Sequence, residues 1–223
     1  MIKINPDILV FYKDLEKNNN REWFEKQKSR YKALESELKV FNEEVKNGLD
    51  KEDDIERVKM FRIYRDIRFS KDKTPYKTHV GVSFHRKKPK LRGGYYMHIK
   101  PENSFIAGGF WGPNPKDLFR IRKELEFDAQ ELRNIINEKK FNLIWGELQG
   151  EKVKTAPKNF NKEHPDIDLI RHKQYIFIKK FNDKSVLSSD FFNEVINNFI
   201  AIRPFFDHMT NILTTDLNGV PII

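Results

Sequence analysis

Apolar residues recur every three or four positions in several long segments of the chain. This period is typical of amphipathic helices that bury one face. Asn5 before Pro6 and Ser188 to Asp190 carry helix-start signals, and Pro204 is expected to kink or restart the last helix. The helices predicted in this way cover residues 5–17, 21–48, 118–136, 164–170 and 191–213.

The period of the pattern changes to two between residues 58 and 111. Strict alternation of apolar and polar residues predicts strands that are buried on one face. Strands are expected over 58–69, 79–85, 95–100 and 105–111, with later strands over 141–148 and 175–181. Sequential strands are usually neighbours, so the first four should form a meander.

These elements together predict an α+β protein: a central antiparallel meander of about four strands plus one or two later strands, packed with N-terminal, middle and C-terminal helices. No internal repeat, low-complexity linker or change of composition divides the sequence. A single domain over residues 1–223 is therefore expected.

One face of the predicted meander is polar and rich in charge. In the first strand the apolar residues, from Phe61 to Phe69, alternate with Arg62, Tyr64, Asp66 and Arg68. If the strands pair in order, this polar side lies beside that of the following strands. The expected neighbours are His79, Ser83, His85, Tyr96, His98 and Lys100.

The charge of the chain favours anionic partners. The formal net charge is +9 and the sequence pI is about 9.5, although many lysine-rich proteins bind no nucleic acid. Cysteine is absent, which excludes disulfides, thiolate metal sites and a cysteine nucleophile. No leader or long apolar run is visible, so we expect a cytoplasmic protein without a membrane partner.

The segment 62–79 is the candidate site because its basic side chains could recognise a phosphate or a carboxylate. A guanidinium offers a rigid donor fork for such anions, and lysines add point charges. The predicted anion-binding residues are Arg62, Arg65, Arg68, Lys71, Lys73 and Lys77. His79 and Asp66 are the candidate catalytic residues, since histidine titrates near neutral pH and Asp66 would orient the arginines.

Other residues are expected to support this site: Tyr64, Ser70, Asp72, Tyr76, His98 and Gly108. Gly108 and Gly109 lie within a predicted strand, where glycine marks a bulge or a close approach, so either a side chain such as Tyr64 or Trp111 or a ligand should fill the space. Arg171 to Lys173 reads as a surface turn that could close over the site. The connector 86–92, RKKPKLR, reads as an exposed loop.

The sequence contains no phosphate loop, dinucleotide fingerprint or nucleophile elbow. His79, His98 and Asp66 lack a metal-ligand spacing, and surrounding cations oppose a divalent ion, so no metal is expected. No cofactor is indicated by any motif. The favoured interpretation is a pocket for an anionic small molecule, which would suit an enzyme acting on a phosphorylated or carboxylated substrate.

Two alternatives remain open at this level. A nucleic-acid-binding module would use the basic connector 86–92 on the backbone and stack bases on tyrosines; the tyrosines available are Tyr64, Tyr76, Tyr95 and Tyr96. A structural or interaction protein without a ligand would have Asp66 and Asp72 neutralise the arginines in an ion-pair network that pins the loop.

Four segments of the chain resemble the bacterial domain-of-unknown-function family 2461: FRIYRDIRFSKDKTPYKTHVGVSF, GYYMHIKPENSFIAGGFWGP, NNREWFEKQKSRY and HPDIDLIRHK. The resemblance covers nearly the whole chain and implies a single-domain conserved hypothetical protein. It implies no reaction, cofactor or catalytic residue. The family motif falls on Arg62, Arg65, Asp66, Arg68, Ser70, Lys71, Asp72, Lys73, Pro75, Tyr76, Lys77 and His79.

Overall fold

A computed structural model describes residues 2–223 of the chain. The helices are α1 (Asp7–Lys17), α2 (Arg21–Leu49), α3 (Pro115–Phe127), α4 (Gln130–Asn137), α5 (Lys139–Trp145), α6 (Ile167–Ile170), α7 (Asp183–Val186), α8 (Phe191–Ala201) and α9 (Arg203–Thr214). The strands are β1 (Ile55–Met60), β2 (Val80–Arg86), β3 (Gly94–Ile99), β4 (Ser104–Phe110) and β5 (Tyr175–Phe181).

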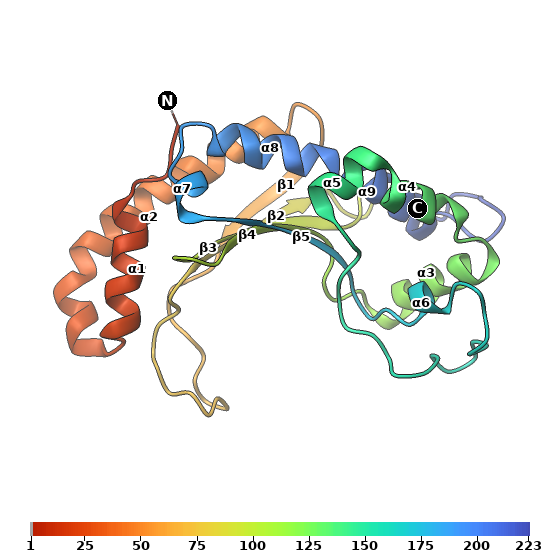
Figure 1. Ribbon diagram of the computed structural model, residues 1–223, viewed down its shortest axis with the longest axis horizontal. Helices are drawn as coiled ribbons and strands as arrows, with labels where there is room; N and C mark the ends of the chain where they lie inside the picture. Colours follow the sequence, from red (N-terminus) through yellow and green to blue (C-terminus); the bar gives the residue numbers. More distant parts are fainter. Residues whose placement is uncertain (1) are drawn as a thin grey trace. The chain divides into compact units, whose positions relative to one another are not determined.

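The strands form one open antiparallel sheet in the order β1-β2-β3-β4-β5, as Figure 1 shows. This confirms the predicted α+β class and the meander. Strand β3 follows the predicted alternation, with Tyr95, Met97 and Ile99 buried and the residues between them partly exposed. The sheet therefore has one apolar face and one face on which polar side chains gather.

The chain divides into two compact units, which are described separately. The first contains the residues up to Phe84, Tyr96–Ile106 and Lys180–Asn197. Its helix α2 packs on α8, where the rings of Phe41 and Phe191 are stacked with centroids 6.1 Å apart. The side chain of Ile196 fills the space over Gly48, so the two helices approach closely.

The second unit contains His85–Tyr95, Ala107–Lys179 and Asn198–Ile223. Its core is built on the aromatic residues of α9. The ring of Phe205 contacts Phe177 of β5 edge to face at 5.1 Å, and Phe206 contacts Tyr95 in the same manner at 5.0 Å. Pro204 stands in the first turn of α9, so the predicted restart of the last helix is confirmed.

Three predicted elements differ in the structure. The first strand ends at Met60 instead of Phe69, and residues 61–79 form a long loop. Residues 141–148 are not a strand, because α5 buries Phe141 and Trp145, which lie four positions apart on one helical face. The helix predicted over 118–136 is two helices, α3 and α4, and the side chain of Asp128 between them accepts a hydrogen bond from the Gln130 amide at 2.7 Å.

Within residues 2–223, none of the helices combines the length and the apolar character that crossing a bilayer requires.

Candidate functional site

The loop between β1 and β2, residues 61–79, is closed by backbone hydrogen bonds and is called the β1–β2 loop below. Arg65 N donates to Pro75 O at 2.9 Å and Lys77 N donates to Ile63 O at 2.8 Å, on either side of a bridge between Tyr64 and Tyr76. Pro75 has no N–H, so pairing cannot continue through it toward the tip. The predicted loop at 70–75 is confirmed, and it begins earlier than predicted.

Tyr76 anchors the base of this loop to the helices. Its ring is buried and stacks on Phe24 of α2, with centroids 4.1 Å apart. The side chain of Asn19 donates to Tyr76 O at 2.9 Å and accepts from Tyr76 N at 3.1 Å. Tyr76 is therefore fixed at the base of the loop by its packing and its backbone hydrogen bonds, and its role in supporting a ligand site stays a prediction.

The arginines of the loop are paired with carboxylates of the same loop. Arg65 bonds Asp72 and the hydroxyl of Thr74, and Arg68 donates to both oxygens of Asp66 at 3.0 and 2.7 Å. The bonds from Thr74 and Arg65 lower the pKa of Asp72 to about 2. This arrangement matches the ion-pair alternative derived from the sequence, because an anion at Arg65 or Arg68 has to compete with a carboxylate.

The other polar side chains of the loop tip do not converge on a common point. Lys73 donates to the Ile67 carbonyl at 3.0 Å, Lys71 is exposed, and Ser70 is half-buried. Asp66 bonds Arg68 and makes no hydrogen bond to His79, so the structure does not join the two predicted catalytic residues. The apolar face predicted for 58–69 is also wrong at its end, because Phe69 is 96% exposed.

A cluster of rings occupies the polar face of β2, β3 and β4. The imidazole of His79 stacks on that of His98 with centroids 4.2 Å apart, and His98 stacks on Phe105 at 4.5 Å. The structure thus brings together the two histidines that the sequence placed on neighbouring strands. Tyr96 completes the cluster, since its hydroxyl lies 3.2 Å from Nδ1 of His98.

Gly81 makes room for this arrangement. A Cβ atom on Gly81 would lie 2.5 Å from the Tyr96 hydroxyl oxygen, so only glycine accommodates the ring in its place. Burial raises the pKa of the Tyr96 phenol, and its hydroxyl forms a hydrogen bond with Nδ1 of His98. When the phenol donates, the other ring nitrogen of His98, Nε2, carries the proton of the neutral imidazole.

Both histidines are neutral at physiological pH. Burial is the main cause that lowers the pKa of His79 to about 4, and the charges of Lys77 and Lys100 add to it. The pKa of His98 is also lowered to about 4, by burial first, then by His79 and Lys100. Among residues 2–223, no side chain or backbone group forms a hydrogen bond with the ring nitrogens of His79, although these atoms are not sealed from solvent.

Cations without a carboxylate partner lie next to this cluster. The ammonium groups of Lys59 and Lys77 lie 5.2 and 5.6 Å from the centroid of Phe61, and Lys77 also donates to the Arg62 carbonyl at 2.9 Å. Burial and the Arg62 charge lower the pKa of Lys77. In the described part of the chain, Lys59, Arg62 and Lys77 form no salt bridge, whereas Lys100 is 3.1 Å from Glu16.

Other predicted site residues lie elsewhere or play a different part. The space over Gly108 is filled by Ile202 and Phe206, so an aliphatic and an aromatic side chain occupy it instead of Tyr64, Trp111 or a ligand. Tyr64 packs on Phe24 at 6.0 Å at the base of the loop.

The basic connector 86–92 is not wholly exposed. Arg86 is fully buried, donates to Arg92 O at 2.7 Å and lies 4.9 Å from the centroid of Phe206. Arg92 in turn pairs with Asp117. The nucleic-acid alternative assigned the cations of this connector to contacts with the nucleic-acid backbone. Two of them, Arg86 and Arg92, instead make contacts within the second unit.

The turn predicted at the surface, residues 171–173, contains a buried residue. His172 is buried, and its Nδ1 lies 3.0 Å from the Gln174 carbonyl. Burial first, then the charge of Lys152, lowers the pKa of His172 to about 4. The strand and turn pattern gave no sign of this burial, because the packing partners come from distant parts of the chain.

Three residues at this cluster were not predicted as site residues from the sequence: Phe61 and Phe105, which contribute rings, and Gly81, which makes room for them. Phe61 was assigned to the apolar face, yet its ring lies 6.4 Å from that of Tyr96 on the polar face. The detectable signal was a glycine inside the strand at 79–85, which often marks a close approach by another group.

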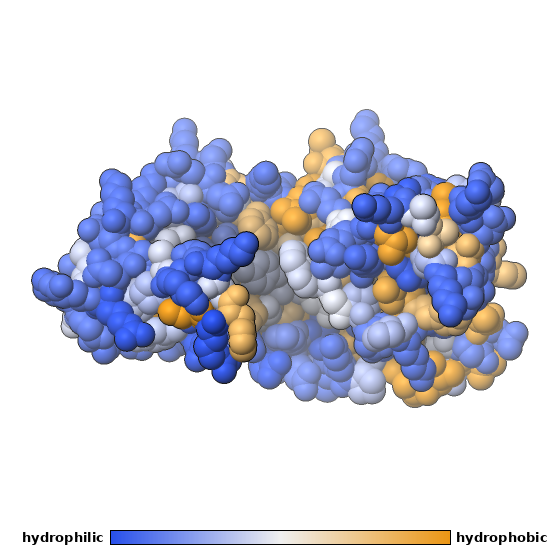
Figure 2. All heavy atoms as spheres, turned by 90° about the horizontal axis from the view of Figure 1, so that it is seen from below, coloured by the Kyte–Doolittle hydropathy of each residue, from blue (hydrophilic) through white to orange (hydrophobic). Residues whose placement is uncertain are grey.

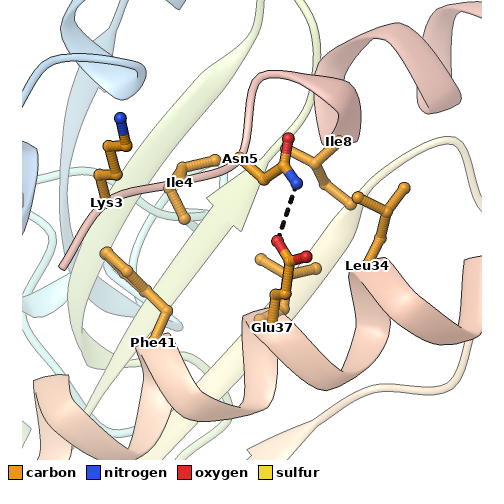
Figure 3. A pocket seen from close by; sticks show the side chains of 8 residues that line it. Lys3, Ile4, Asn5, Ile8, Leu34, Glu37 and Phe41 are labelled. Atoms are coloured by element: carbon orange, nitrogen blue, oxygen red, sulfur yellow. Dashed lines mark hydrogen bonds between the residues drawn. The ribbon is translucent and has the colours of Figure 1, made fainter.

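Two cavities away from the ring cluster add no reactive groups to it. Figure 3 shows one between α1 and α2, lined by Ile4, Ile8 and Leu34 and bordered by the hydrogen bond from Asn5 to Glu37 at 2.8 Å. Its volume is ≈ 10 Å³, which is about the space that one water molecule needs. A larger hollow, of ≈ 500 Å³, lies between Asn134, Phe141 and Pro204, and its lining is mainly apolar.

The fold and the site define an α+β protein whose open antiparallel sheet carries stacked histidines on its polar face, near cations that form no salt bridge within residues 2–223. The chain belongs to the family described as conserved hypothetical protein (DUF2461), which matches residues 7–208. This confirms the resemblance seen in the sequence. No curated protein and no solved structure matches the chain.

Proposed function

We propose that the protein binds an anionic small molecule, through a phosphate or a carboxylate group, on the polar face of β2 and β3. The observation that carries this proposal is the position of His79: its ring nitrogens have no hydrogen-bond partner among residues 2–223, and the charge of Lys77 acts on it. Lys77 and Arg62, whose charge acts on Lys77, form no salt bridge in that part of the chain. An anion entering at this point gains ammonium, guanidinium and imidazole donors together.

The electrostatics of the ring cluster support the same ligand class. Lys77 and Lys100 disfavour a proton on His79, and the stacked rings disfavour two protons at once. A bound anion reverses both effects, because it attracts the positive form of the imidazole. His79 is then the group that takes up or returns a proton, while the phenol of Tyr96 holds His98 in the Nε2-protonated form.

In this proposal Arg62 and Lys77 are the principal cations, with Lys59 and Lys100 nearby. Arg65 and Arg68 keep the loop in shape through Asp72 and Asp66. The nucleic-acid alternative that was derived from the sequence has less support, since two of the four tyrosines that would stack on bases, Tyr76 and Tyr95, are buried.

The test uses inorganic phosphate as the probe and the ring proton NMR signals of His79 and His98 as the readout. We expect a saturable shift of both signals, and Lys77→Met should weaken the binding by about 10- to 100-fold, since a hydrogen bond to a charged group contributes roughly 1.5–3 kcal/mol. Arg62→Ala tests the same site at an exposed position that leaves packing intact.

The control is Lys116→Met, which removes an exposed lysine of α3 and should leave phosphate binding unchanged. The proposal is wrong if phosphate produces no saturable shift, or if Lys77→Met and Arg62→Ala both bind phosphate as the wild type does. A thermal melt of each variant confirms that the fold is retained.

A further inference from the structure

The tip of the β1–β2 loop displays an aromatic ring to solvent. Phe69 is 96% exposed, the largest value among the big hydrophobic side chains of residues 2–223. Single exposed hydrophobic residues are common on protein surfaces and need no explanation by themselves. The surroundings of Phe69 are what make this position informative.

Hydrogen bonds hold the tip in its outward position. The Ile67 carbonyl accepts from the Ser70 amide at 3.4 Å and from the Lys73 ammonium at 3.0 Å, and Arg68 is pinned by both oxygens of Asp66. Figure 1 shows the loop extending away from the sheet strands that it connects. The ring is therefore presented by a braced turn, so little conformational entropy is lost when a partner binds it.

The tip is also strongly basic. Between Arg62 and Lys77 the sequence has six basic and two acidic side chains. The guanidinium carbon of Arg68 lies 6.0 Å from the centroid of Phe69, and Lys71 and Lys73 follow on the exposed side. Figure 2 shows the surface viewed from below as mostly hydrophilic, with hydrophobic residues gathered in a few patches.

A single ring among charges fits a polyanion better than it fits a protein. Stable protein interfaces rest on a cluster of apolar anchors over roughly 800 Å² per partner. The other exposed rings of this loop, Phe61 and Tyr64, pack against Tyr96 and Phe24 away from the tip. A nucleic acid base, by contrast, stacks on one exposed aromatic ring while cations beside the ring contact the neighbouring phosphates.

We propose that the tip of the β1–β2 loop binds single-stranded nucleic acid, with Phe69 stacking on a base and Lys71 contacting a flanking phosphate. The strand must be single because the face of a base is open for stacking only when the base is not enclosed in a duplex. This surface differs from the basic connector at 86–92, and it is independent of the phosphate site proposed at His79.

The test measures fluorescence anisotropy of a labelled thymidine oligomer of about 12 nucleotides, a length within the range that single-strand sites cover. Stacking on one base corresponds to about 5- to 150-fold in affinity, so Phe69→Ala should weaken binding by that factor. The matched control is Phe127→Ala, which removes another highly exposed phenylalanine, and it should bind the oligomer as the wild type does.

Salt dependence tests the role of the cations. The logarithm of affinity should fall with the logarithm of salt concentration, and Lys71→Ala should reduce that slope by about 0.7, the value for one phosphate contact on a single strand. Phe69→Ala should leave the slope and the melting temperature unchanged, since the ring carries no charge and is not packed.

Three results would overturn the proposal: no binding at low salt, equal affinity of Phe69→Ala and wild type, or equal affinity for the single strand and a duplex of the same length. Inorganic phosphate binding at His79 is measured separately by NMR and should not change in Phe69→Ala. The two proposals can therefore fail independently.

Discussion

Acid should destabilise the folded protein through the stacked histidines, and His79→Gln should remove part of that effect. The pKa of His79 is lowered to about 4 from the model-compound value of 6.5, mainly by burial. The unfolded chain therefore takes up a proton that the folded site resists. The stability is fully present above pH 6.5 and is lost as the pH falls from 6.5 toward 4.

The magnitude follows from the difference between these two pKa values. Between about pH 7.5 and about pH 5, an unscreened shift of this size corresponds to about 2 kcal/mol of unfolding free energy. His79 is only half-buried, and solvent screening reduces this to about 1 kcal/mol. His98 behaves in the same direction, so the wild type should lose about twice this amount from the pair.

Urea unfolding at the two pH values measures the effect. We expect the pH-dependent loss of stability in His79→Gln to be smaller than in the wild type by about 1 kcal/mol. The contribution of His172, which titrates in the same range, cancels in this comparison because both proteins contain it. Wild-type stability that is flat across this range, or an equal loss in wild type and variant, would refute the reasoning; an NMR titration giving His79 a pKa near 6.5 would do so directly.

Two further predictions concern the elements that hold the site. Gly81→Ala should reduce stability by about 1–3 kcal/mol, because its Cβ would meet the Tyr96 hydroxyl; Tyr96→Phe should relieve the loss, and urea unfolding of the single and double variants checks both. Tyr76→Ala should lower the free energy of unfolding by about 3 kcal/mol, because the stacking on Phe24 is lost. Hydrogen exchange at the Arg65 and Lys77 amides should become faster. An unchanged rate at these amides would count against the anchoring role of Tyr76.

The strands and helices with a strong period were predictable because their pattern reports one buried face. In β3 the alternation from Tyr95 to Ile99 gave both the strand and the side that faces the core. The pairing of His79 with His98 also followed, since neighbouring antiparallel strands bring residues of the same face together. The family resemblance added confirmation of the whole pattern, but no chemistry.

The prediction failed where a pattern could be satisfied in more than one way. Residues 61–69 alternate like a strand, yet Pro75 offers no N–H and β2 has already ended its pairing with Phe61. The alternation therefore became a loop in which Asp66 and Asp72 pair with the arginines. Arg86 looked like part of an exposed basic run, but it is buried against Phe206 of α9, which lies far away in the sequence.

The sequence by itself determined the α+β class, the order of the strands, the basic character of the protein and the segment that carries its candidate site. Those properties follow from local periodicity and charge, which are present before the chain folds. Only the tertiary structure decided which cations are neutralised, that the ring nitrogens of His79 have no hydrogen-bond partner among the described residues, and that Phe69 points to solvent. These depend on which distant groups approach each side chain, and that is fixed by packing.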